Sequence, residues 1–305
     1  MNAGRLSLIL LGCLGLAAMA LAPWIVGDYL VGVGLSLLMW IALTESWVVL
    51  SGMTGYISLG HVVFFGIGGY VLVLLRPDLP LWLVIPMAGA AACLFALLIG
   101  YPVLRVRGPY FVILTYGLSE LVKFVVINIE AALGKFGRLL LGAPSTSDLY
   151  EVMLVLALVA AALAFVVRRS RFGTGLRAIR EDEAAAETTG VPAARFKLIA
   201  FALSAAVPGM VGAVMALRSS YFEPAQAFSP TVSFTIVTMA IIGGSDDAPG
   251  PLLGAAFLVI LSELLWANLP EIYMILVGIL LIGFVLLAPE GIYGRLLAGR
   301  RRVGA

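Results

Sequence analysis

The chain has 305 residues, of which 62% are apolar and 12% are charged, and its formal net charge is +2. A soluble domain carries about 25% charged residues and a disordered chain has low hydrophobicity, so the composition excludes both classes. The near-neutral charge balance gives no reason to expect a nucleic-acid partner. We therefore expect an all-α polytopic membrane protein, with one transmembrane domain over residues 1–305 that is surrounded by membrane lipid.

Ten apolar runs predict the membrane spans, because a helix needs about 20 apolar residues to cross the hydrocarbon core. Six of them contain no Asp, Glu, Lys or Arg: 6–27, 46–75, 79–104, 198–217, 224–245 and 272–289. Four more are shorter or interrupted by a charge or two: 29–50, 108–128, 150–167 and 248–267. We expect about ten transmembrane or re-entrant helices, with the glycine-rich pieces 55–75 and 230–243 broken or re-entrant.

The first run also has features of a secretory signal, since Arg5 precedes it and the Ala-Met-Ala at 18–20 resembles a cleavage site. It is long for a signal and further spans follow at once, so we expect it to be retained. Lys and Arg accumulate in cytoplasmic connections, and ten spans that start inside place 14 of the 19 basic residues in the cytoplasm. Both termini are then cytoplasmic, as are Arg105, Arg107 and residues 168–197.

Residues 168–197, called the charged segment below, hold 11 of the chain's 36 charged residues. One helical stripe in it is formed by Leu176, Ile179, Glu183 and Ala186. The run 178–188 is rich in helix formers, and Gly190 supplies a stop signal. We expect one short amphipathic helix whose small residues let a partner surface approach. The alternative is a solvated loop that merely obeys the positive-inside rule.

Two rows of small residues predict close helix packing, because lipid provides no hydrophobic drive between helices. One row consists of Ala205, Gly209 and Ala213, and the other of Gly250 and Gly254. Pro208 lies within the first row, and we expect it to kink that helix.

Three acids lie within predicted spans and are costly in lipid, so we expect them to face the bundle interior. Glu45 and Glu263 are interpreted as structural. Glu120 follows Thr115 and Tyr116 along one predicted helix, and both a structural role and a role in a polar pathway stay open for it.

Four stretches and a short tail carry a pattern that extends over most of the chain. They are SGMTGYISLGHVVFFGIGGY (51–70), RVRGPYFVILTYGLSEL (105–121), FGTGLRAIREDEAAAETTGVPAARFKLIAFALSAAVPGMVGAVMA (172–216), SFTIVTMAIIGGSDDAPGPLLGA (233–255) and APEGIYG (288–294). In these stretches and their order, the chain resembles the membrane (permease) subunits of bacterial ABC importers for branched-chain amino acids.

The resemblance implies a permease subunit in the bacterial inner membrane that forms half of a translocation pathway and is not itself an enzyme. Its partners would be two cytoplasmic ATP-binding subunits, a second, paralogous permease subunit and a periplasmic solute-binding protein. ATP and Mg²⁺ would bind to the ATPase subunits, and this chain has no GxxxxGK[ST] phosphate-binding motif. In the family, about residues 170–195 would be the coupling helix that docks on the ATPase. The contacts expected there are Arg177, Arg180, Glu181, Glu183, Glu187 and Gly190.

The stretch from Gly52 to His61 holds three glycines and three hydroxyl-bearing residues at membrane depth. Unwound backbone is tolerated there only against protein or a water-filled cavity, and broken helices often build polar sites near the midplane. The candidates for the translocation pathway are Tyr56, Ser58, His61, Thr115, Tyr116 and Glu120. The alternative is that the glycines permit tight packing and the hydroxyls bond back to helix carbonyls.

His61 is the one histidine, and Cys13 and Cys93 lie in separate apolar runs, so we expect neither a metal site nor a disulfide. Ser58 and His61 have the spacing of a nucleophile and its base on one helical face, but no oxyanion-hole motif accompanies them. An intramembrane enzyme is therefore one rival class. An ion-coupled secondary transporter is the other, which would carry its own ion-coupling acids and need no ionic cytoplasmic helix.

Three places depart from the family pattern and bear on the solute. Residues 129–149 lack a glycine-rich segment, and 243–250 read GGSDDAPG, with two adjacent aspartates. Arg218 stands near the outer end of a span, close to Glu223, where the pair would orient a zwitterion or face the binding protein. The solute is then leucine, isoleucine or valine, or another small molecule such as urea, an amide or another amino or organic acid.

Overall fold

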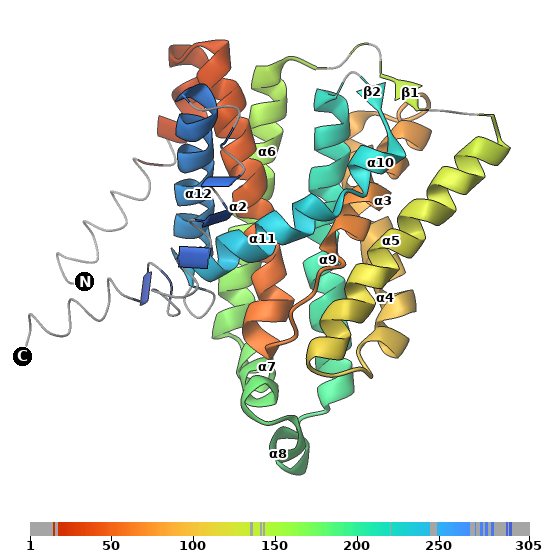
Figure 1. Ribbon diagram of the computed structural model, residues 1–305, viewed down its shortest axis with the longest axis vertical. Coiled ribbons are helices and arrows are strands. Elements are labelled where there is room, and N and C mark those ends of the chain that lie inside the picture. The colour runs from red at the N-terminus through yellow and green to blue at the C-terminus, as the bar shows by residue number, and fades with distance from the viewer. Residues whose placement is uncertain are drawn as a thin grey trace, which may run out of the picture.

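A computed structural model shows the chain as a bundle of long helices (Figure 1). It describes residues 18–268 apart from 135, 136, 141, 143, 220 and 245–248, together with residue 15 and scattered residues between 272 and 294. Half of the predicted span 6–27 and most of 272–289 lie outside the described residues, and Cys13 and the basic residues at 295–302 lie wholly outside them.

The described chain is mostly helical. Its long helices are α2 (Asp28–Thr54), α4 (Leu81–Val103), α5 (Pro109–Ala132), α6 (Thr146–Arg169) and α9 (Ala193–Arg218). The shorter helices are α3 (His61–Leu75), α7 (Arg171–Glu181), α8 (Glu183–Thr188), α10 (Pro224–Ala227), α11 (Pro230–Gly243) and α12 (Pro249–Asn268). Two short strands, β1 (Arg138–Leu139) and β2 (Tyr221–Phe222), pair in antiparallel fashion.

Among the described residues, six helical stretches are long and apolar enough to cross a membrane. They are the five long helices and the stretch Pro224–Gly243, which comprises α10 and α11. α3 and α12 contain shorter apolar stretches. These helices confirm an all-α polytopic membrane protein. The expected total of about ten transmembrane or re-entrant helices and the cytoplasmic orientation of the termini stay predictions.

The first glycine-rich piece, 55–75, is interrupted as the sequence predicts, whereas the second, 230–243, forms the continuous helix α11. α2 ends at Thr54, where Gly55 takes a φ of 75° that favours glycine, and α3 starts at His61. Residues 55–60 between them are called the unwound segment below. A short break at 228–229 precedes the second piece and separates α10 from α11, which runs obliquely across the bundle (Figure 1).

Small residues bring α9 against α3 and α4, as the first predicted row requires. A methyl group added at Gly209 would lie 2.6 Å from the Cβ of Ala92 on α4, and one at Gly68 on α3 would overlap the carbonyl of Gly209. The second row is confirmed in the same way, because a methyl group at Gly254 would overlap the carbonyl oxygen of Met239. α9 stays helical through its internal proline, and a kink there stays a prediction.

The predicted buried acids have three different surroundings. Glu45 is buried, with 3% of its surface exposed, as expected for an interior acid. Glu120 is half-buried, and Lys123 lies 2.6 Å from it one turn along α5. Glu263 accepts a hydrogen bond from the hydroxyl of Tyr29 on α2. The last two acids therefore have partners within the bundle.

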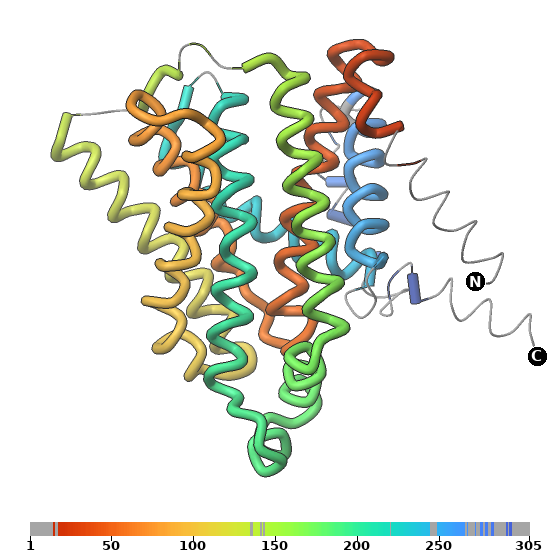
Figure 2. Tube along the Cα trace, turned by 180° about the vertical axis from the view of Figure 1, so that it is seen from behind, coloured from red at the N-terminus to blue at the C-terminus, as the bar shows by residue number. Residues whose placement is uncertain are grey.

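The helices carry the charged segment to the end of the molecule opposite the strands. Seen from behind, α4, α9 and α6 run side by side toward α7 and α8 (Figure 2). A capping box at Ser145 and Asp148 starts α6 at the strand end. The connection between α4 and α5, with Arg105 and Arg107, lies at the same end as α7 and α8, so these predicted cytoplasmic residues share one side.

Candidate functional site

The charged segment forms two short helices where the sequence predicts one. Asp182 has an extended backbone between α7 and α8, and its Oδ1 accepts hydrogen bonds from the N–H groups of Ala184 at 2.8 Å and Ala185 at 3.0 Å. An aspartate in this position caps the start of a new helix. The capping bonds are the physical reason for the break, and they change the direction of the chain just before Glu183.

Both helices bury their apolar side against the bundle, as the predicted stripe requires. Leu176 and Ile179 of α7 and Ala186 of α8 are each at most 3% exposed. α8 ends at Thr188, and Gly190 takes a φ of 91°, which confirms the predicted stop signal. The segment is therefore packed on the membrane domain rather than solvated on all sides.

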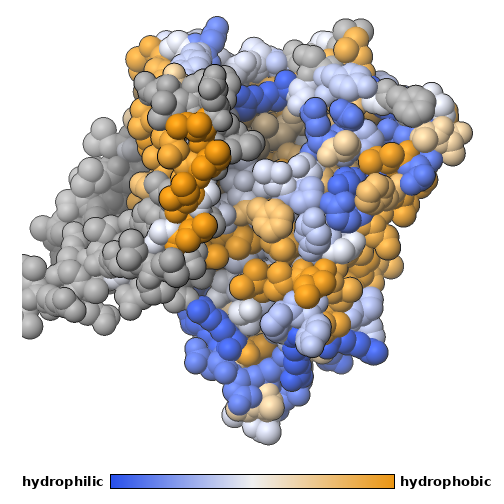
Figure 3. Space-filling model, in the orientation of Figure 1, coloured by the Kyte–Doolittle hydropathy of each residue, from blue (hydrophilic) through white to orange (hydrophobic). Residues whose placement is uncertain are grey.

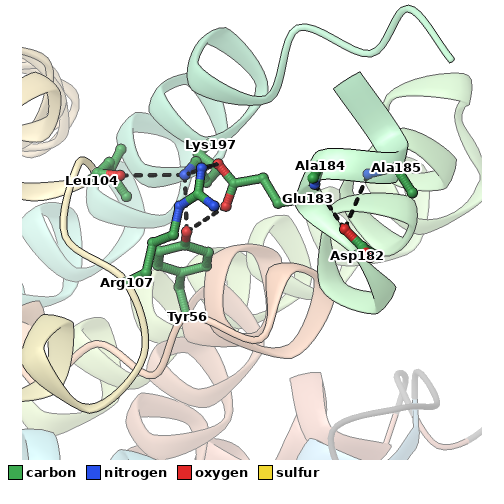
Figure 4. A network of polar contacts seen from close by, with 8 residues as sticks. All are labelled: Tyr56, Leu104, Arg107, Asp182, Glu183, Ala184, Ala185 and Lys197. Atoms are coloured by element: carbon green, nitrogen blue, oxygen red, sulfur yellow. Dashed lines mark hydrogen bonds and ion pairs between the residues drawn. The ribbon is translucent and has the colours of Figure 1, made fainter. Parts of the chain in front are cut away.

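Glu183 joins the charged segment to the unwound segment (Figure 4). The Tyr56 hydroxyl donates a 2.6 Å hydrogen bond to its Oε2. Its Oε1 lies 2.7 Å from the Nζ of Lys197 and 3.1 Å from an Nη of Arg107. Lys197 Nζ also donates to the Tyr56 hydroxyl at 3.0 Å and to the Leu104 carbonyl at 3.3 Å. One network thus connects α8, α9, the unwound segment and the α4–α5 connection.

Glu183 and Lys197 are largely shielded from water, whereas the Arg107 side chain is 62% exposed. The side chain of Lys197 is 4% exposed and that of Glu183 is 11% exposed. Burial opposes ionisation of Glu183, but hydrogen bonds from Lys197 and Tyr56 and the charges of Lys197 and Arg107 hold its pKa below the usual value. Glu183 therefore carries its negative charge at neutral pH, and each buried charge faces an opposite one.

A second contact ties α7 to the end of α2. The Arg180 guanidinium donates a 2.9 Å hydrogen bond to the carbonyl of Gly52, in the last turn of α2. The last carbonyls of a helix lack partners within it and carry partial negative charge, so a cation stabilises this end. The two helices of the charged segment therefore hold both the end of α2 and the turn that follows it.

The backbone of the unwound segment is held by side chains from several helices. The Ser58 carbonyl accepts from Trp47 Nε1 at 2.8 Å, and the Leu59 N–H donates to Thr115 Oγ1 at 3.1 Å. Just beyond the segment, the Val62 N–H donates to Ser233 Oγ at 3.1 Å. Buried backbone groups outside a helix need such partners. The conformation is therefore specified by the protein around it.

The structure brings together four of the six predicted pathway residues. Tyr56, Ser58 and His61 lie in or beside the unwound segment, and Thr115 contacts it directly. Tyr116 instead is 38% exposed, with its ring 6.0 Å from that of Phe234. Glu120, paired with Lys123, lies further along α5.

Ser58 and His61 are both fully buried. The Ser58 hydroxyl lies 3.3 Å from His61 Nδ1 and accepts from the Gly60 N–H. The Nε2 of His61 has no hydrogen-bond partner within the described residues. Solvent does not reach this pair in the observed conformation.

The predicted coupling residues divide into two groups. Arg177, Glu181, Glu187 and Gly190 are exposed and face away from the bundle. Glu183 and Arg180 are bonded to the membrane domain. Sequence reasoning missed Lys197 as the counterion of Glu183. The available signal was a lysine four residues into a helix that continues as an apolar span.

Arg218 and Glu223 do not form a pair. The Arg218 guanidinium donates to Ser36 Oγ at 2.8 Å and to the Gly32 carbonyl at 3.5 Å, both on α2. Glu223 follows β2 and starts α10. A joint role of the two residues in holding one zwitterion therefore has no support in their contacts.

The apolar bundle, its interrupted helices and the charged segment define a multi-pass α-helical membrane protein with a buried polar link to one end. The chain belongs to the family of permease components of branched-chain amino acid transport systems, whose model matches residues 29–285.

Three relatives illustrate the range of similarity. The chain is 29% identical over 278 residues to LivM of Escherichia coli strain K12, a high-affinity branched-chain amino acid transport system permease protein. This match covers 80% of the chain and 65% of LivM, so the chain spans slightly less than two thirds of that relative.

Shorter matches reach a second set of permeases. The chain is 30% identical over 145 residues to the corresponding LivH protein of the same strain, covering 47% of the chain and 46% of LivH. It is 25% identical over 184 residues to a probable LivH of Methanocaldococcus jannaschii, covering 58% of the chain and 55% of that protein. No solved structure matches the chain.

Proposed function

We propose that the chain is a permease subunit of an ATP-driven importer for branched-chain amino acids. Family membership and the names of the relatives support a transport role and this class of solute. The observation that carries the mechanism is the bond between Tyr56 and Glu183, because it links a charged surface helix to the interruption between two apolar helices.

In this mechanism, ATPase subunits dock on the exposed faces of α7 and α8, where Arg177, Glu181 and Glu187 point outward. Closure of the ATPase dimer would displace α8. Glu183 would transmit this displacement to the unwound segment and to α9, because it is bonded to Tyr56 and Lys197. The bundle would then rock between outward and inward access, a rigid-body switch of a known kind.

The proposed assembly contains two cytoplasmic ATP-binding subunits, a second permease subunit and a periplasmic solute-binding protein in the bacterial inner membrane. ATP and Mg²⁺ would bind to the ATPase subunits. The similarity to both LivM and LivH supports a pair of related permeases. The charged segment and both termini would face the cytoplasm.

Uptake by the purified assembly tests the function. The chain is tagged, purified with the subunits that accompany it and reconstituted in liposomes with the binding protein. We expect leucine uptake that requires ATP. Uptake of urea, an amide or an organic acid in place of leucine would show that the chain belongs to an ATP-driven importer for a different solute. Uptake by the chain alone under an ion gradient would contradict the proposal in favour of a secondary transporter.

Charge reversal on α8 tests the docking surface. Glu187→Lys alters an exposed residue, so we expect unchanged thermal stability but a lower ratio of solute transported to ATP hydrolysed. Glu151→Lys, an exposed acid on α6 outside this surface, is the matched control. Equal ratios in the two variants would show that α8 does not contact the ATPase.

A further inference from the structure

A cavity of about 240 Å³ opens on the bundle away from the charged segment. Residues of α2, α3, α9, β2, α10 and α11 line it. Figure 3 shows the molecule hollowed on this face, between α2 and α12 on one side and β2 and α10 on the other. The volume is that of about eight liquid waters, which suits a small amino acid.

The wall of the cavity is mostly apolar with a few polar groups. Its polar side chains are those of Ser219, Glu223 and Gln226, and its apolar ones include Trp40, Phe65 and Val232. Small-molecule sites are mostly apolar with a few placed polar groups that fix orientation. A zwitterion with an aliphatic side chain matches this combination.

Glu223 is the one charged residue in that wall. It is half-buried, and no hydrogen bond or ion pair of its carboxylate is found in the part of the chain that the structure describes. A partly buried carboxylate gains most from a cation that also donates hydrogen bonds. An ammonium group meets both requirements, while the Gln226 amide offers a donor for a carboxylate.

The cavity is connected to the start of α3, which follows the unwound segment. Val232 lines the cavity and adjoins Ser233, whose hydroxyl accepts from the N–H of Val62 at 3.1 Å. Phe65, on the next turn of α3, also lines it. A solute in the cavity would therefore contact α3 and α11 close to the bond that joins them.

We infer that this cavity is the outward-facing solute site of the permease, in which Glu223 binds the ammonium group of a small aliphatic amino acid and the apolar lining residues bind its side chain. The inference rests on the proposed function and adds the residues that bind the solute.

Protection of a cysteine reporter tests the site. Cys13 and Cys93 are replaced by Ser, and Val232→Cys is introduced as a near-isosteric reporter in the cavity. The assembly purified through this chain is treated with a small methanethiosulfonate reagent while leucine is titrated. At ten times its Kd, leucine should slow the modification about ten-fold, because about nine-tenths of the sites are then occupied. Leu139→Cys, 64% exposed on β1, is the control reporter and should show no protection.

Two further comparisons test the chemistry. 4-Methylpentanoate, which lacks the ammonium group, should protect Val232→Cys far less than leucine. Glu223→Gln should abolish protection by leucine, whereas Glu151→Gln, an exposed acid at the same end of the bundle, should retain it. Protection that survives Glu223→Gln, or that is equal for leucine and 4-methylpentanoate, would contradict the assignment.

The remaining outcomes separate this site from the proposed function. A Val232→Cys reporter that does not react without leucine would show that another subunit covers the cavity, which overturns the site. ATP-driven leucine uptake with no protection also overturns the site and leaves the proposed function intact. Absence of any ATP-driven uptake overturns the proposed function instead.

Discussion

The hydroxyl of Tyr56 donates a 2.6 Å hydrogen bond to Glu183, which lies 127 residues later in the chain. Tyr56 belongs to the turn that interrupts two apolar helices, and Glu183 belongs to the most charged segment of the sequence. Lys197 contacts both, with its Nζ 4.5 Å from the centre of the tyrosine ring. Any movement of α8 must therefore either move this turn or break a buried charge-assisted network.

Removal of the buried cation should destabilise the protein. Lys197→Met leaves Glu183 largely buried without its main counterion, and we expect a loss of about 3 kcal/mol in the free energy of unfolding. Thermal unfolding in detergent measures this effect. Arg195→Met removes an exposed cation two residues earlier and should change stability little.

The double variant with Glu183→Gln and Lys197→Met completes this test. It removes both charges, so we expect it to be more stable than Lys197→Met alone. If Lys197→Met and the double variant both unfolded at the wild-type temperature, the network would not contribute to stability.

Loss of the Tyr56 hydroxyl should affect coupling more than folding. Tyr56→Phe keeps the edge-to-face contact with Phe111, whose ring centre lies 5.1 Å away, and removes the donor to Glu183. We expect a stability loss of about 1 kcal/mol and a lower ratio of solute transported to ATP hydrolysed. Tyr110→Phe, at a residue 74% exposed on α5, is the control. An unchanged ratio in Tyr56→Phe would show that the signal does not pass through this bond.

The sequence predicted the segments that form this site but not the contacts between them. Gly55 marked the break, because its positive φ favours glycine. The high density of charged residues at 168–197 indicated the segment that forms α7 and α8. The partners Lys197 and Glu183 approach through tertiary packing of α8 on α9, which periodicity and spacing do not contain. Asp182 precedes a run of alanines, and an aspartate in this position is a helix-start signal that predicts the second helix of the charged segment.

The close contact between α3 and α9 should leave no room for an added methyl group. Gly68→Ala would place a methyl group on the backbone of Gly209, so α3 or α9 must shift, and overpacking of this kind costs about 2 kcal/mol. Gly117→Ala on α5 has open space around the added methyl group and should raise stability by about 0.5–1 kcal/mol. Opposite signs of the two changes in the free energy of unfolding are the expected result. A neutral Gly68→Ala would contradict the close approach.

The conformation of the unwound segment should depend on Thr115. Thr115→Val keeps the shape of the side chain but leaves the buried N–H of Leu59 without its 3.1 Å acceptor, which costs about 2 kcal/mol. Thr235→Val on α11 is the matched control, because it removes only a hydroxyl that bonds to a carbonyl of its own helix. Hydrogen exchange of the amides at 56–62 should accelerate in Thr115→Val and not in Thr235→Val, since an unpaired turn opens more often. Equal exchange in both variants would mean that contacts other than Thr115 fix the conformation of the unwound segment.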